Sequence, residues 1–113
     1  MASVHVEGAP FRIDDLRRAT SFWARFRGLM LRSQLPGGSG LLIEPCGSIH
    51  MLFMRFPIDA VFYNRDGVVT HVARNVRPWL GMARGPGKTH GVIELPAGAA
   101  AGLEPGARLS FDS

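Results

Sequence analysis

Five residues with polar groups lie within or beside apolar runs of this chain, and each could do chemistry: His50, Arg55, Asp59, Trp79 and Glu94. A charged side chain in an apolar setting must be compensated by an opposite charge or by a ligand. Ligand pockets combine apolar walls with a few convergent polar groups. These residues predict a pocket lined by Arg55, Asp59 and Glu94, with His50 near it and Trp79 over it.

A structural role is the alternative for the same charges. Arg55 and Asp59 have the same parity along an extended chain, and a bend at Pro57 could bring them together. They would then form an internal ion pair that sets the strand register, with Glu94 on a solvated face. The sequence leaves both interpretations open.

Cysteine and metal chemistry are less well supported. On one extended strand Cys46 and His50 would lie about 13 Å apart, too far for a thiolate and its base. Met51 and Met54 would complete a set of soft ligands, but alternation places Met51 on the opposite face from His50 and Met54. We expect no metal and no cofactor.

The segment from Arg77 to His90 is rich in glycine and proline and shows no periodicity. Loops of this length in compact domains are usually functional or mobile. Its residues 85–89, Gly-Pro-Gly-Lys-Thr, end like a phosphate-binding P-loop, but that motif needs glycine where Met82 stands. We therefore reject nucleotide binding of that kind, and expect the segment to border a cleft.

Short strands dominate the expected structure. The apolar run from Pro45 to Tyr63 predicts two strands bent near Pro57, and Asp66-Gly67 predicts a hairpin between 61–63 and 68–72. Further strands are expected at 11–18, 41–43, 92–95 and 108–111, and a short amphipathic helix at about Ser21 to Arg27. The fold class is mainly β, a β-sandwich or partly closed barrel of mostly antiparallel strands.

Composition limits the class of protein. A chain of 113 residues forms one domain, 1–113, and 46% hydrophobic with 19% charged residues is typical of a globular protein. One cysteine, no membrane-spanning run and no signal-like start predict a soluble, cytoplasmic protein. The formal charge of +4 is scattered along the chain, so we do not expect nucleic acid as a partner. The oligomeric state is not predicted.

Several motifs resemble those of a bacterial and archaeal family known as domain of unknown function 192. They are residues 27–32, 49–51, 54–59, 61–62 and 93–98, and the resemblance spans about 11–111. The resemblance implies a compact, mainly β domain with a small helix, and it implies no activity.

Three hypotheses for the function follow. The first is a domain that binds a small polar or anionic ligand, a carbohydrate being one candidate, in a cleft bordered by 77–90. The second is a hydrolase that uses Asp59 or Glu94 as general base and Arg55 to stabilise developing charge. The third is a nucleic-acid-binding module that uses Trp79 and nearby arginines.

Overall fold

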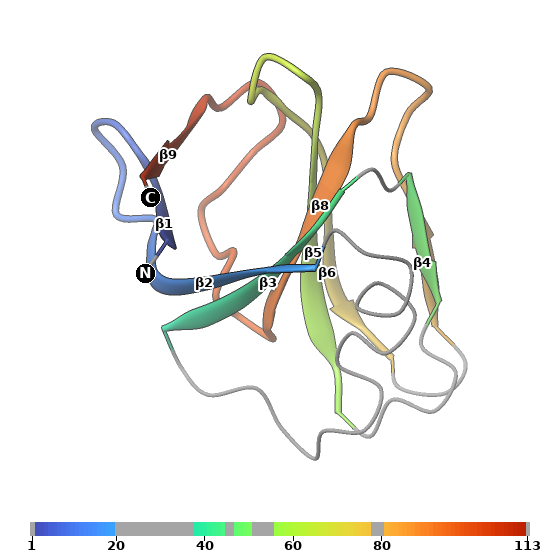
Figure 1. Ribbon diagram of the computed structural model, residues 1–113. Coiled ribbons are helices and arrows are strands. Elements are labelled where there is room, and N and C mark those ends of the chain that lie inside the picture. The colour runs from blue at the N-terminus through green and yellow to red at the C-terminus, as the bar shows by residue number, and fades with distance from the viewer. Residues whose placement is uncertain (1, 20–37, 45–46, 51–55, 78–80, 113) are drawn as a thin grey trace.

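The structure is a computed structural model that describes residues 2–19, 38–44, 47–50, 56–77 and 81–112 (Figure 1). The strands of this described part are β1 (Ala2–Val6), β2 (Arg12–Ala19), β3 (Ser39–Ile43), β4 (Ser48–His50), β5 (Ile58–Tyr63), β6 (Val69–Val76), β7 (Met82–Arg84), β8 (Gly91–Pro96) and β9 (Leu109–Asp112). The described segments contain no helix long and apolar enough to cross a membrane. The helix expected at Ser21 to Arg27 lies outside the described residues.

Seven strands form one curled sheet in the order β6-β5-β8-β3-β2-β1-β9 (Figure 1). β2 and β3 are parallel, and the other neighbours are antiparallel. The two ends of the sheet approach each other, where Val68 bridges to Arg108 and the Leu109 N–H donates to the Gly67 carbonyl at 2.8 Å. The predicted mainly β, partly closed barrel is thus confirmed as a half-barrel.

Strand alternation divides the apolar side chains between two faces. The inner face of the curl carries the larger cluster, to which Val61, Ile93 and Leu42 belong together with residues of β1, β2 and β9. The outer face of β5, β8 and β3 carries a second cluster that includes Phe62 and Val92. These central strands are buried on both faces, which explains their nearly continuous apolar sequences.

The predicted hairpin joins β5 to β6 in antiparallel fashion, with Tyr63 opposite Val69. Gly67 has a φ of 81°, a conformation that glycine adopts without steric cost. The Asn64 side-chain oxygen accepts the N–H groups of Asp66 and Val68 at 2.9 and 3.0 Å. The Asn64 side chain therefore satisfies two backbone N–H groups of the turn. The hairpin itself is the one that the sequence predicted.

One expectation from the sequence needs correction. The segment 77–90 is not an unstructured loop, because it contains β7, whose Ala83 lies opposite Ile49 of β4 in a separate two-stranded sheet. The two strands predicted in the run from Pro45 to Tyr63 are confirmed as β4 and β5, which belong to different sheets. β1, which the sequence did not predict, pairs with both β2 and β9.

Candidate functional site

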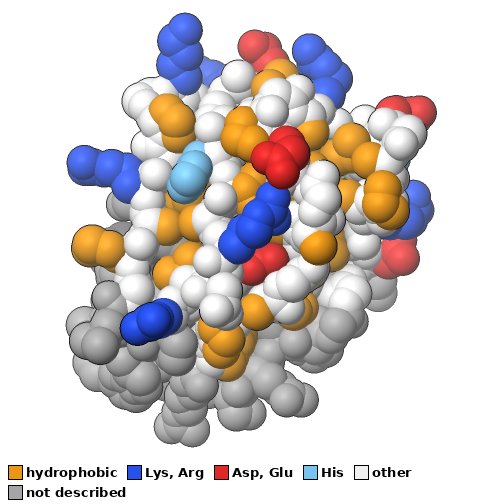
Figure 2. All heavy atoms as spheres, turned by 180° about the vertical axis from the view of Figure 1, so that it is seen from behind, with side chains coloured by type: hydrophobic (Ala, Val, Ile, Leu, Met, Phe, Trp, Pro, Cys, Tyr) orange, Lys and Arg blue, Asp and Glu red, His pale blue; other side chains and the backbone are white. Residues whose placement is uncertain are grey.

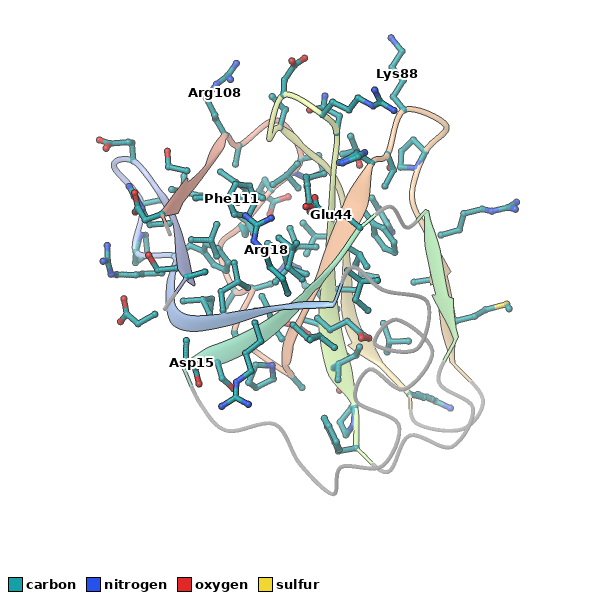
Figure 3. All side chains as sticks on the ribbon, in the orientation of Figure 1. Asp15, Arg18, Glu44, Lys88, Arg108 and Phe111 are labelled. Atoms are coloured by element: carbon teal, nitrogen blue, oxygen red, sulfur yellow. The ribbon has the colours of Figure 1, made fainter. Side chains whose placement is uncertain are left out.

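A cleft of about 680 Å³ lies where two turns of the sheet stand side by side. One turn joins β5 to β6 and supplies Asn64, Arg65 and Asp66, and the other precedes β8. The full described lining is Gly47, Asn64, Arg65, Asp66, Gly87, Lys88, Thr89 and His90. Figure 3 shows Lys88 on the second turn at the upper edge of the molecule, on the opposite side from Asp15. Segment 77–90 therefore borders a cleft, through its last four residues.

The lining carries more positive than negative charge. Arg65 and Lys88 are exposed, and neither forms an ion pair with another residue in the described ranges. Asp66 is the one acidic residue of the described lining. The Thr89 side chain is fixed by a hydrogen bond between its hydroxyl and that of Thr70, at 2.8 Å. Two cationic side chains from separate turns thus share one cleft.

A carboxylate lies beside the histidine of the cleft. Glu44 follows β3, and its Oε2 accepts a hydrogen bond from the Tyr63 hydroxyl at 2.7 Å. The same oxygen lies 3.5 Å from Nε2 of His90, while Oε1 accepts from Arg18 at 3.1 Å. Figure 3 shows Arg18 and Glu44 directed toward each other. The His90 imidazole is therefore positioned by a carboxylate that is itself held by two donors.

Gly91 allows this network to form at the start of β8. A Cβ on Gly91 would lie 2.5 Å from the Tyr63 hydroxyl oxygen and 3.0 Å from the Ile43 carbonyl oxygen. The aromatic ring of Tyr63 also contacts the His90 ring edge-on, with centroids 6.3 Å apart. A glycine is needed here because the Tyr63 side chain crosses the backbone of β8 at van der Waals distance.

Asp59, one of the predicted site residues, is buried and fully engaged by the backbone. Its Oδ1 accepts the N–H of Asn75 at 2.9 Å, and its Oδ2 accepts those of Gly98 and Ala100 at 3.0 Å each. Backbone N–H groups thus occupy three of the roughly four acceptor sites of the carboxylate. These hydrogen bonds join β5 to β6 and to the turns that follow β8.

Glu94 lies on the other face of the same sheet. In the β5–β8 register Glu94 is opposite Ala60, whereas Asp59 is opposite Leu95, so the two acidic side chains project to opposite faces. Glu94 is 7% exposed, and burial raises its pKa from 4.5 to about 7. Asp59 and Glu94 therefore cannot line one pocket together.

The other predicted site residues are placed only in part. His50 is in β4, where its backbone is opposite Met82 of β7, and Arg55 and Trp79 lie outside the described residues. Neither Asp59 nor Glu94 belongs to the described lining of the cleft. His90 and Glu44 could not be identified as neighbours from the sequence, because no local motif links residues that β3, β5 and β8 bring together.

Comparison with known proteins gives a family and a fold. The model of the family DUF192, described as "Uncharacterized ACR", matches residues 3–111. A solved protein of unknown function from Novosphingobium aromaticivorans DSM 12444 is 27% identical, with a TM-score of 0.84 over 96% of this chain and 83% of that one. A "putative transcription regulator" from Sinorhizobium meliloti 1021 is 24% identical, with a TM-score of 0.83 over 97% and 92% of the two chains. No curated protein matches the sequence.

Proposed function

Since this chain belongs to the DUF192 family, whose description assigns no activity, we propose a function from geometry: it binds a small anionic ligand in the cleft between residues 64–66 and 87–90. The observation that carries the proposal is the convergence of Arg65 and Lys88. They come from two different turns, border the same cleft, and have no acidic partner among the described side chains.

The two cations differ in how they would hold an anion. The planar guanidinium of Arg65 can donate two parallel hydrogen bonds to a phosphate or carboxylate, while the Lys88 ammonium acts as a point charge. His90 adds an imidazole ring at the wall of the cleft. A phosphate or carboxylate group fits this set of donors, and an acidic or phosphorylated carbohydrate is one candidate that carries such a group.

Binding of orthophosphate tests the proposal, measured by titration calorimetry at low ionic strength because exposed charges are screened by salt. Arg65→Gln and Lys88→Gln should each raise the dissociation constant about fivefold or more. Arg17→Gln is the matched control, since it removes the same charge from an exposed residue of β2 that does not line the cleft. Equal loss in all three variants, or no phosphate binding at all, would contradict the proposal.

A hydrolase is the second candidate, and one observation favours it. With Asp59 engaged by three backbone N–H groups, Glu94 is the remaining acidic candidate, and its raised pKa of about 7 suits a general base. Glu94 does not belong to the described lining of the anion cleft. A Glu94→Gln variant that keeps orthophosphate affinity but loses a hydrolytic activity of the purified protein would support this candidate.

On the one face that Figure 2 shows, the described charges do not favour a nucleic-acid-binding module. On the face opposite to Figure 1, the Lys and Arg side chains stand apart and alternate with acidic ones (Figure 2). Nucleic-acid binding would give an affinity that falls steeply with salt. We expect no change in fluorescence anisotropy of labelled single-stranded DNA or RNA, even at low salt.

A further inference from the structure

A second hollow continues the cleft past the turn that precedes β8. It has a volume of about 370 Å³ and is lined by Gly47, Arg84, Gly85, Pro86, Gly87 and Thr89. Gly47, Gly87 and Thr89 line both hollows, so the two hollows adjoin at these residues; we call the two together the groove and the three shared residues its junction. The Gly85 N–H donates to the Gly47 carbonyl at 2.8 Å, which fixes the two sides of the junction to each other.

Each of the two hollows is bordered by cationic side chains that do not line the other. Arg65 and Lys88 border the larger hollow, and Arg84, an exposed residue at the end of β7, borders the smaller one. None of the ion pairs in the described part of the chain involves Arg84. Arg84 and Lys88 are four positions apart in the chain, so their Cα atoms are at most about 14 Å apart.

The glycines at the junction have no structural reason to be glycine. Of the described glycines, Gly47 and Gly87 alone combine an ordinary φ with open space around the position of an added Cβ. The other described glycines have either a positive φ or a neighbouring atom that a Cβ would meet within 4 Å. Both exceptions line both hollows, and neither has a side chain that could fill the space where the hollows adjoin.

We propose that the ligand is a small molecule with two anionic groups, one held by Arg65 and Lys88 and the other by Arg84, joined by a short chain that passes over Gly47 and Gly87. This inference rests on the anion binding proposed above and names the class of ligand. Two tethered anionic groups bind more tightly than one, because the second group binds at a high effective concentration. Thr89 is the side chain at the junction that can hydrogen-bond to the connecting chain.

A set of alkyl phosphates with one or two phosphate groups tests the proposal. The probes are butyl phosphate, with one anionic group, and the α,ω-bisphosphates of propanediol, butanediol and hexanediol, which cover the spacings that the groove allows. In calorimetric titrations of the full chain, we expect at least one bisphosphate to bind about tenfold more tightly than butyl phosphate. Arg84→Gln should abolish this advantage and leave the affinity for butyl phosphate within about twofold of the wild type.

The junction is tested by filling it. Gly87→Leu and, independently, Gly47→Leu should abolish the bisphosphate advantage while the melting temperature stays that of the wild type, because neither backbone position is strained. If one of the two leucine variants does not fold, the other variant still tests the proposal. If butyl phosphate binds but every bisphosphate binds no better, or if the advantage survives Arg84→Gln and the leucine variants, the inference is overturned and anion binding stands. If none of the four phosphates binds, both proposals fail.

Discussion

The Asp59 carboxylate accepts the backbone N–H of Asn75 at 2.9 Å, and Asn75, with a φ of 52°, is the one non-glycine residue of the described ranges that has a positive φ. The two residues face each other at a β-bulge. Ile58 pairs with Val76 and Ala60 with Ala73, so two residues of β6 lie opposite Asp59 alone. A bulge removes one N–H from the ladder, and the carboxylate satisfies it.

The bulge also connects β6 to the turns that follow β8. Asp59 accepts the N–H groups of Gly98 and Ala100, while the guanidinium of Arg74, the other bulged residue, donates to the carbonyls of Ala100 and Leu103. Donors and acceptors of one backbone segment are thus bound by side chains from two adjacent strands. The arrangement explains why a buried carboxylate is tolerated in β5.

Replacement of Asp59 should therefore reduce stability severely. Asp59→Ala leaves the buried N–H of Ala100 and the part-buried N–H groups of Asn75 and Gly98 without this acceptor, and we expect a loss of about 3 kcal/mol in the free energy of unfolding. Urea denaturation followed by tryptophan fluorescence measures it. Asp66→Ala, which removes an exposed carboxylate, should cost less than about 0.5 kcal/mol. A loss for Asp59→Ala as small as that for Asp66→Ala would show that water replaces the carboxylate.

The buried Glu94 predicts a pH-dependent stability. Its pKa is about 7 in the folded chain and 4.5 when unfolded, so the folded state holds the proton more tightly. The stability from the protonated group is fully present below pH 4.5 and is lost as the pH rises through 7. Relative to wild type, Glu94→Gln should gain about 3 kcal/mol between pH 5 and pH 8. Glu104→Gln, at an exposed position, should show no such trend, and a flat difference for Glu94→Gln would contradict the prediction.

The parts of the fold that could be predicted from the sequence are the local ones. The β5–β6 turn follows from Asp66 and Gly67, whose conformational preferences act within four residues. The pairing of β4 with β7 could not be predicted, because two strands of three residues are too short to show alternation. Segment 77–90 was predicted as a loop because β7 is too short to show alternation in the sequence.

The sequence predicted a cleft bordered by segment 77–90, but none of its five candidate site residues belongs to the described lining of the cleft found there. Arg65 of that lining stands in the turn that the sequence predicted. Glu44 meets Tyr63 and His90 only because β3, β5 and β8, which are distant in sequence, are neighbours in the sheet. Asp59 receives the Asn75 N–H because β6 has a bulge opposite it. The sequence does not show that the Asp59 carboxylate is compensated by three backbone N–H groups, because the residues that donate them are distant in the sequence.

The two donors to Glu44 should contribute unequally to stability. The Tyr63 hydroxyl is 2.7 Å from Oε2 and the Tyr63 side chain is buried, whereas the Arg18 side chain is 49% exposed. A double-mutant cycle of Tyr63→Phe with Glu44→Gln should give a coupling energy of about 1 kcal/mol. The cycle of Arg18→Gln with Glu44→Gln should give less than about 0.5 kcal/mol because solvent screens the pair. The reverse order would mean that the ion pair holds Glu44 in place.

Two glycines near the cleft should respond in opposite ways to the same substitution. In Gly91→Ala the new methyl group meets the Tyr63 hydroxyl oxygen and the Ile43 carbonyl oxygen, and the carbonyl belongs to a paired strand and cannot move freely. Forcing an extra methyl group into a packed site costs about 1–3 kcal/mol. We therefore expect Gly91→Ala to lower the free energy of unfolding by that amount.

Gly87→Ala is the matched control, four residues earlier in the chain. Its φ is ordinary and an added Cβ meets no atom within 4 Å, so the folded state accepts alanine without strain. Alanine also restricts the unfolded chain, which should leave stability unchanged or raise it by up to about 1 kcal/mol. Urea denaturation of both variants gives the comparison. If Gly91→Ala is as stable as Gly87→Ala, Tyr63 does not cross β8 at the distance described, and the hydrogen bond that holds Glu44 beside His90 does not form as it is placed here.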